Sequence, residues 1–72
     1  MKYLGHKNWN HWNVSLWLLN DYNEYRNMVD LQSRYGKDKA ARIMAHSLVG
    51  RKTPDGAPFS YSSIRAAFVG LS

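Results

Sequence analysis

The chain has 72 residues, no cysteine and a net charge of +5 at pH 7. A chain of this length buries only about 60 % of its unfolded surface, so a second domain is excluded and residues 1–72 are expected to form one helical domain. Without cysteine there are no disulfide bonds and no thiolate metal sites. No apolar stretch approaches the roughly 20 residues of a membrane span, and residues 1–6 lack a signal-peptide core, so we expect a soluble protein of the cytoplasm without membrane contact.

The first predicted helix covers about residues 9–19. Asn8 or Asn10 is expected to cap it, and Asn13 and Asn20 are expected to bond to neighbouring backbone. Its apolar side chains recur at helical spacing and predict a core face made of Trp9, Trp12, Leu16, Trp17 and Leu19. The alternative is that this aromatic patch binds a partner.

A second helix is predicted from Asp21 to about Tyr35. Asp21 and Glu24 have the spacing of a capping box, and Gly36 supplies the left-handed residue that ends the helix. The side chains expected to face the core are Tyr25, Met28, Val29 and Gln32 or Tyr35.

A third helix is predicted over residues 38–49, with Asp38 as its N-cap and Gly50 as its end. The expected inward side chains are Ala40, Ile43, Met44, Ser47 and Leu48. Lys39, Arg42 and His46 are spaced three and four residues apart, so they share one basic face.

The segment 53–56, Thr-Pro-Asp-Gly, predicts a type I turn because Pro54 fixes φ at the second position. Ser60 is expected to cap a last helix of about ten residues, with Tyr61 and Arg65 one turn apart. The core positions of this helix are Ile64, Ala67, Phe68 and Leu71. Together the elements predict an all-α bundle of about four short helices. The alternative is an α+β fold with a short hairpin around residues 51–59.

The net positive charge of the chain comes from its second half. Residues 1–33 contain three cations and three carboxylates, whereas residues 34–72 contain seven cations and two carboxylates. A basic face attracts phosphate and acidic protein surfaces. The alternative is a solvated surface that only keeps the protein soluble.

Groups suited to catalysis are sparse. His6, His11 and His46 do not have the three- or four-residue spacing of a helical metal site. Two of the five carboxylates are assigned to caps, and no positioned base is evident for Ser62 or its neighbouring serines. We therefore expect no metal, no cofactor and no enzymatic activity.

Residues 8–21 carry a motif of the form Asn-x-x-x-Trp-Asn-Val-x-Leu-Trp-x-x-Asn-Asp, which is made by Asn8, Trp12, Asn13, Val14, Leu16, Trp17, Asn20 and Asp21. The motif resembles that of a family of small, mostly uncharacterised proteins of tailed bacteriophages. Tyr3, Gly5 and Tyr25 also suit the pattern, whereas residues 10–11 depart from it. The resemblance implies an accessory protein in the cytoplasm of the infected bacterium. Such proteins commonly bind a host enzyme, a defence component or DNA.

Residues 53–65 are similar to the entry of recognition helices in some recombinase DNA-binding segments. In that interpretation Tyr61, Ser62 and Arg65 would face the groove, while Arg51 and Lys52 would contact phosphates. The break before this helix is longer than the three or four residues of a standard helix-turn-helix.

Two functions remain. In the favoured one the protein binds an acidic surface of a bacterial host protein and inhibits or redirects it; in the other it is a nucleic-acid-binding module with a turn-helix element at residues 51–70. The same candidate residues serve both: Lys37, Lys39, Arg42, His46, Arg51, Lys52, Tyr61 and Arg65. A homodimer is a further alternative, because it would complete a small core.

Overall fold

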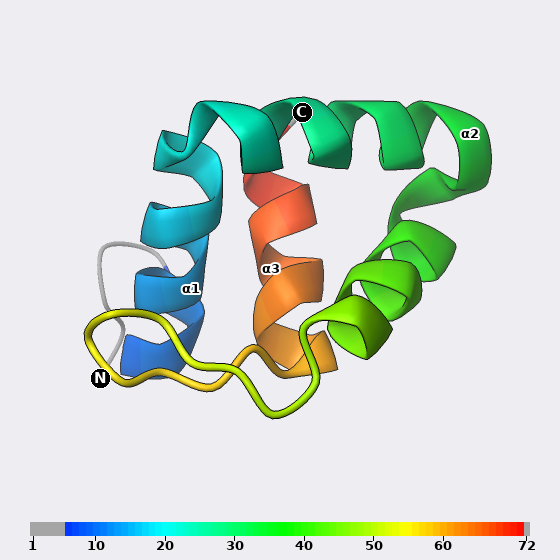
Figure 1. Cartoon of the computed structure of the whole chain (residues 1–72). Coiled ribbons are helices and arrows are strands. Elements are labelled where there is room, and N and C mark those ends of the chain that lie inside the picture. Colours follow the sequence, from blue (N-terminus) through cyan, green and yellow to red (C-terminus); the bar gives the residue numbers. More distant parts are fainter. Residues whose placement is uncertain (1–5, 72) are drawn as a thin grey trace.

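The fold consists of three helices in the computed structural model, which describes residues 6–71. These are α1 (Trp9–Asn20), α2 (Tyr22–Ser47) and α3 (Tyr61–Leu71). Figure 1 shows α3 between α1 and the second half of α2, while the first half of α2 crosses the ends of α1 and α3. The described residues contain no strand, so the all-α prediction is confirmed. Tyr3 and Gly5 of the motif lie outside the described residues.

Gly36 divides α2 into two segments of different direction (Figure 1). Its φ of 82° and ψ of 168° interrupt the helix, so the second and third predicted helices form one kinked element. Gly36 is the one residue inside α2 with non-helical angles. An N-cap requires such angles, so the prediction that Asp38 caps a helix is wrong. Asp38 lies within the helical residues, where its carboxylate accepts a charged hydrogen bond from Arg65 of α3.

The other predicted caps are confirmed by hydrogen bonds within one turn. The side chains of Asn8, Asp21 and Ser60 accept from the backbone N–H three residues further along, at 3.0, 3.1 and 3.2 Å. Gly50 has a φ of 77° in the turn that follows α2. The helix ends are therefore set by local side-chain chemistry.

The core is built around α3, because this helix packs against both of its neighbours. Its three fully buried apolar side chains are Ile64, Ala67 and Phe68, as predicted. The other elements add Val14, Leu18, Met28, Ala40, Ala41, Met44 and Ala57. Ala40, Ala41 and Met44 are the buried residues of the second half of α2, which also contacts α3.

The predicted core face of α1 is wrong by part of a turn. Val14 and Leu18 are buried together with Asn13 and Ser15, whereas Leu16 is exposed and Trp17 is 39 % exposed. Of the other predicted residues, Trp9, Trp12 and Leu19 are half-buried. The face is turned because α1 packs against the loop after α2 as well as against α3.

The predicted core face of α2 is also only partly correct. Met28 is buried and Gln32, one of the two alternatives for the last position, is half-buried. Tyr25, Val29 and Tyr35 are exposed on this first half of α2, which crosses the ends of the other helices (Figure 1). In the second half, Ala40 and Met44 are buried and Leu48 is half-buried, as expected, whereas the prediction fails for Ile43 and Ser47, which are exposed.

The loop of residues 51–59 is not a hairpin of strands. It contains one isolated antiparallel bridge, between Lys52 and Pro58. Gly56 N–H donates to Thr53 O at 2.8 Å and closes the predicted turn, and Thr53 N–H donates to Ala57 O at 2.8 Å. The α+β alternative is therefore wrong for the described residues.

Candidate binding surface

Asp55 fastens the turn of the loop to α1. Its Oδ2 accepts hydrogen bonds from Asn13 Nδ2 at 2.8 Å and from Trp17 Nε1 at 2.9 Å. Asn13 and Trp17 are four residues apart, so both donors lie on the same side of α1. The bond from Asn13, followed by that from Trp17, lowers the pKa of Asp55 because both donors favour the charged carboxylate.

Thr53 completes this contact on the buried side. Its hydroxyl donates to Asn13 Oδ1 at 2.5 Å and accepts from the N–H of Ala57 at 3.0 Å. Asn13 is 1 % exposed, so its amide is buried and bonded at both its oxygen and its nitrogen. We call Asn13, Trp17, Thr53 and Asp55 the loop clamp. The expectation that Asn13 bonds to neighbouring backbone is wrong, because its partners lie 40 and 42 residues away.

The loop clamp accounts for part of the Asn/Trp motif. Asn13 and Trp17 hold the loop, and Asp21 caps α2. Asn20 is exposed at the end of α1. Asn13, Trp17 and Asp21 therefore have structural roles within the chain, although Trp17 is exposed and not part of the core.

A second link joins the beginnings of α1 and α3. His11 Nε2 and Ser62 Oγ lie 2.7 Å apart, within hydrogen-bond distance. Partial burial lowers the pKa of His11, and the positive charges of Lys7 and His6 add to this effect. A serine beside a neutral imidazole also occurs in nucleophilic catalysis. Neither side chain lines the three hollows described below, so this pair has no substrate cavity there.

The second half of α2 presents the predicted basic face. Lys39, Arg42 and His46 surround the exposed Ile43 and line a shallow hollow of about 610 Å³ with it. The Lys39 ammonium lies 5.1 Å from the centre of the Tyr35 ring. The structure therefore brings together an apolar centre and a basic rim.

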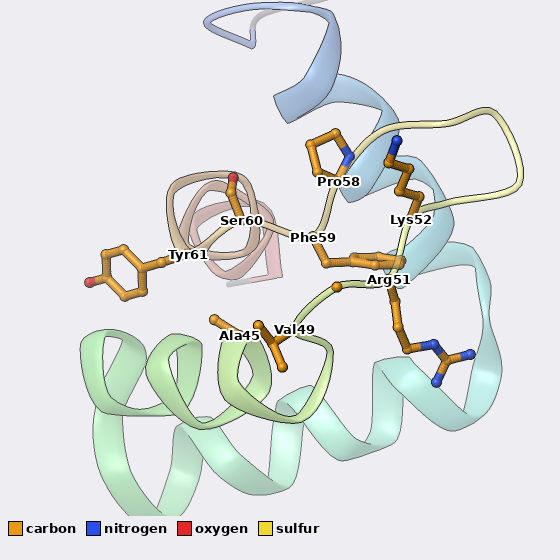
Figure 2. Close-up of a pocket in the computed structure, with 9 residues that line it drawn as sticks. Ala45, Val49, Arg51, Lys52, Pro58, Phe59, Ser60 and Tyr61 are labelled. Atoms are coloured by element: carbon orange, nitrogen blue, oxygen red, sulfur yellow. The ribbon is translucent and has the colours of Figure 1, made fainter.

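A second hollow, of about 360 Å³, lies between the end of α2 and the start of α3 (Figure 2). Val49, Phe59 and Tyr61 give it apolar walls, and Arg51 and Lys52 give it two cations. Arg51 and Lys52 also line a wider hollow, of about 830 Å³, that extends to Trp17 and Glu24. These two cations therefore stand between two concave parts of the surface.

The remaining predicted binding residues are placed differently. Arg65 Nε donates to Asp38 Oδ1 at 2.5 Å, so its charge is paired within the protein. Ser62 contacts His11, and Lys37 is half-buried. Because α3 lies between two other helices and two of its expected groove contacts are engaged, the arrangement does not favour a recognition helix.

Residues 6–71 contain neither a cluster of metal ligands nor a membrane-spanning helix. No group of three or more His, Asp or Glu side chains in this part of the chain is arranged to hold a metal ion. None of the helices described combines the length and the apolar character that crossing a membrane requires.

Residues 1–69 match the model of a family of unknown function, DUF7249, and the chain belongs to that family. No curated protein and no solved structure matches the chain. The family carries no assigned activity.

Proposed function

We propose that this protein is a binding module that docks on an acidic surface of another protein and inhibits or redirects it. The contact is made by the basic surface, which we define as Lys39, Arg42, His46, Arg51 and Lys52 with the apolar side chains between them. The observation that carries the proposal is the exposure of Ile43 and Val49, at 36 % and 74 %, among these basic side chains.

Helical spacing connects the two parts of the basic surface, which are residues 39–46 and residues 51–52. Arg42, His46 and Val49 are four and three residues apart, which is the spacing of a single stripe along a helix. Val49 continues this stripe beyond the end of α2, since its N–H donates to His46 O at 3.5 Å. Members of this stripe line both hollows, because Arg42 and His46 line the one beside Ile43 and Val49 lines the one beside Phe59.

The apolar content of this face favours a protein over a nucleic acid. Protein interfaces combine an apolar centre with a polar rim, whereas contacts to nucleic acid are dominated by phosphate and are strongly polar. Ile43 and Val49 would gain little from contact with phosphates. Carboxylates of the partner would pair with the surrounding cations and speed the encounter.

The resemblance of residues 8–21 to small proteins of tailed bacteriophages supports a more specific proposal. In this proposal the chain is a phage accessory protein, its partner is a bacterial host protein, and it acts in the cytoplasm of the infected cell. Neither a cofactor nor catalysis is required for this role.

The test is affinity capture from a bacterial lysate, followed by calorimetry with the purified partner. We expect one protein to be recovered in stoichiometric amount by the native chain and lost with Arg42→Glu combined with Arg51→Glu. The matched control is Arg26→Glu combined with Arg34→Glu, which makes the same change of net charge on the first half of α2, where Arg26 lies 5.8 Å from the centre of the Tyr22 ring and Arg34 pairs with Asp30.

Two outcomes would contradict the proposal. One is retention of the partner by the doubly reversed variant. The other is recovery of no protein, together with salt-dependent binding to a DNA duplex that the same two substitutions abolish. The second outcome would establish the nucleic-acid alternative.

A further inference from the structure

We infer that the hollow in Figure 2 is an anchor pocket, which receives one large apolar side chain of an acidic segment of the partner protein. This inference rests on the proposed function and specifies the chemistry of the partner. It is carried by the walls of the pocket, the placement of its two cations and the way in which its loop is held.

The walls of the pocket are apolar on three sides. Ala45 and Val49 come from the end of α2, Phe59 from the loop and Tyr61 from the first turn of α3. The hydroxyl of Ser60, which also lines the pocket, is used in bonds with Ser63. A volume of about 360 Å³ is ample, because a cavity of about 150 Å³ already holds a benzene-sized molecule.

The backbone of the loop holds Arg51 and Lys52, the residues that carry the two cations, beside the apolar wall. Phe59 N–H donates to Arg51 O at 3.3 Å, and Lys52 forms its bridge with Pro58. Each basic residue therefore lies opposite an apolar one. In the view of Figure 2, Lys52 and Arg51 extend on opposite sides of the Phe59 ring.

The charge of the lining residues selects the occupant. They include two cations and no carboxylate. An apolar side chain with acidic neighbours therefore matches both the apolar walls and the two cations. A nucleobase could stack on Phe59, but the aliphatic walls of Ala45 and Val49 offer no partner for the polar edge of a base. An aromatic or large aliphatic side chain flanked by Asp or Glu is the better fit.

The loop clamp holds the loop that forms part of the pocket in place before a partner binds. Asn13 and Trp17 of α1 hold Asp55, and the turn between Thr53 and Gly56 is closed by its own hydrogen bond. Arg51, Lys52 and Phe59 flank this fixed segment on either side. Binding therefore costs little ordering of the loop, which is the condition for a small pocket to contribute strongly to affinity.

The experiment is a titration of the whole isotope-labelled chain, followed by NMR. The probes are the peptide Glu-Asp-Glu-Phe-Glu-Asp-Glu, the same peptide with Ser in place of Phe, and an eight-nucleotide thymidine oligonucleotide. We expect the Phe peptide to shift the amide signals of Gly50, Phe59 and Tyr61 and to bind about tenfold more tightly than the Ser peptide, a difference of about 1.4 kcal/mol.

Two variants localise the effect. Val49→Glu places a carboxylate on the exposed rim and should remove the tenfold preference for Phe. Val29→Glu makes the same change on the first half of α2, where Val29 is likewise exposed, and should leave the preference intact.

Equal binding of the two peptides, or shifts confined to the surroundings of Ile43, would overturn the anchor pocket while leaving the proposed function standing. Absence of shifts with both peptides at millimolar concentration would also overturn the anchor pocket. Shifts at Phe59 and Tyr61 caused by the oligonucleotide, with none from either peptide, would overturn both proposals together.

Discussion

The loop clamp and the basic surface use polar side chains in opposite ways. In the loop clamp, the Asn13 amide and the Thr53 hydroxyl are buried and bonded to groups of the same chain. On the basic surface, Arg42 and His46 are exposed beside the apolar Ile43 and Val49. The segment with the most unusual composition therefore holds the fold together, and the more ordinary segment carries the surface proposed to bind a partner.

The largest effect that should separate these regions comes from Asn13→Ala. The substitution removes bonds to both Thr53 and Asp55 from a buried position, so we expect the free energy of unfolding to fall by about 3 kcal/mol. Urea denaturation measures this change. Asn20→Ala, at the exposed end of α1, is the control and should change the free energy of unfolding by less than about 0.5 kcal/mol. Equal effects of the two substitutions would contradict the role of the loop clamp.

The next effect concerns Gly36, whose kink directs the basic half of α2. A Cβ at this position meets no atom within 4 Å, so the cost of Gly36→Ala is purely conformational. Its angles belong to a region that is essentially restricted to glycine, and we expect a loss of about 2 kcal/mol in thermal unfolding. Gly70→Ala is a control of opposite sign, because Gly70 is helical and its added Cβ would lie 3.6 Å from Leu19 Cδ1. This second change should stabilise the protein by about 0.5–1 kcal/mol.

Acid should weaken the loop clamp. The pKa of Asp55 is lowered in the folded state, so its carboxylate stabilises the fold above the ordinary value of 3.8, and this stabilisation is lost as pH falls through the lowered pKa. We expect the melting temperature to fall more steeply below pH 3.8 in the native chain than in Asp55→Asn. Parallel curves for the two proteins would show that the charge of Asp55 does not act through these bonds.

The titration of His11 should change the melting temperature separately, by a smaller amount and at higher pH. Its lowered pKa means that folding favours the neutral ring, so the stabilisation is complete above the ordinary value of 6.5 and declines as pH falls below it. A melting-temperature profile between pH 7 and 5 should be flatter in His11→Gln than in the native chain. Identical slopes would contradict this assignment.

The smallest effect on stability is expected from the basic surface itself. Arg42→Glu changes an exposed side chain and should alter the free energy of unfolding by less than about 0.5 kcal/mol. Calorimetric unfolding checks this expectation. A loss of several kcal/mol would show that Arg42 supports the fold, and it would no longer contrast with Asn13.

The sequence was most informative where structure depends on neighbouring residues. The caps at Asn8, Asp21 and Ser60 and the breaks at Gly36 and Gly50 depend on contacts within one turn, so local patterns predicted them. The shared face of Lys39, Arg42 and His46 could be predicted for the same reason, because helical spacing alone brings these side chains together.

Features that depend on distant residues were missed. The periodicity of α1 assigned its tryptophans to the core, whereas the loop after α2 turned Asn13 inward and left Trp17 half-exposed. The clamp residues Thr53 and Asp55 were interpreted as parts of a turn and of the segment that leads into the last helix. A signal was present, since Asn13 and Trp17 place two N–H donors one turn apart. Their acceptor lies about 40 residues away, however, and spacing along the chain does not identify it.

The bonding of Thr53 has a consequence for the dynamics of the loop. Its N–H donates to Ala57 O, and the N–H of Ala57 donates back to the Thr53 hydroxyl, while that hydroxyl is tied to buried Asn13. Opening the loop would therefore uncover part of α1, so the two segments form one cooperative unit. The amide hydrogens of Thr53 and Ala57 should exchange with solvent deuterium as slowly as those of the helices, although they lie in a segment without regular secondary structure.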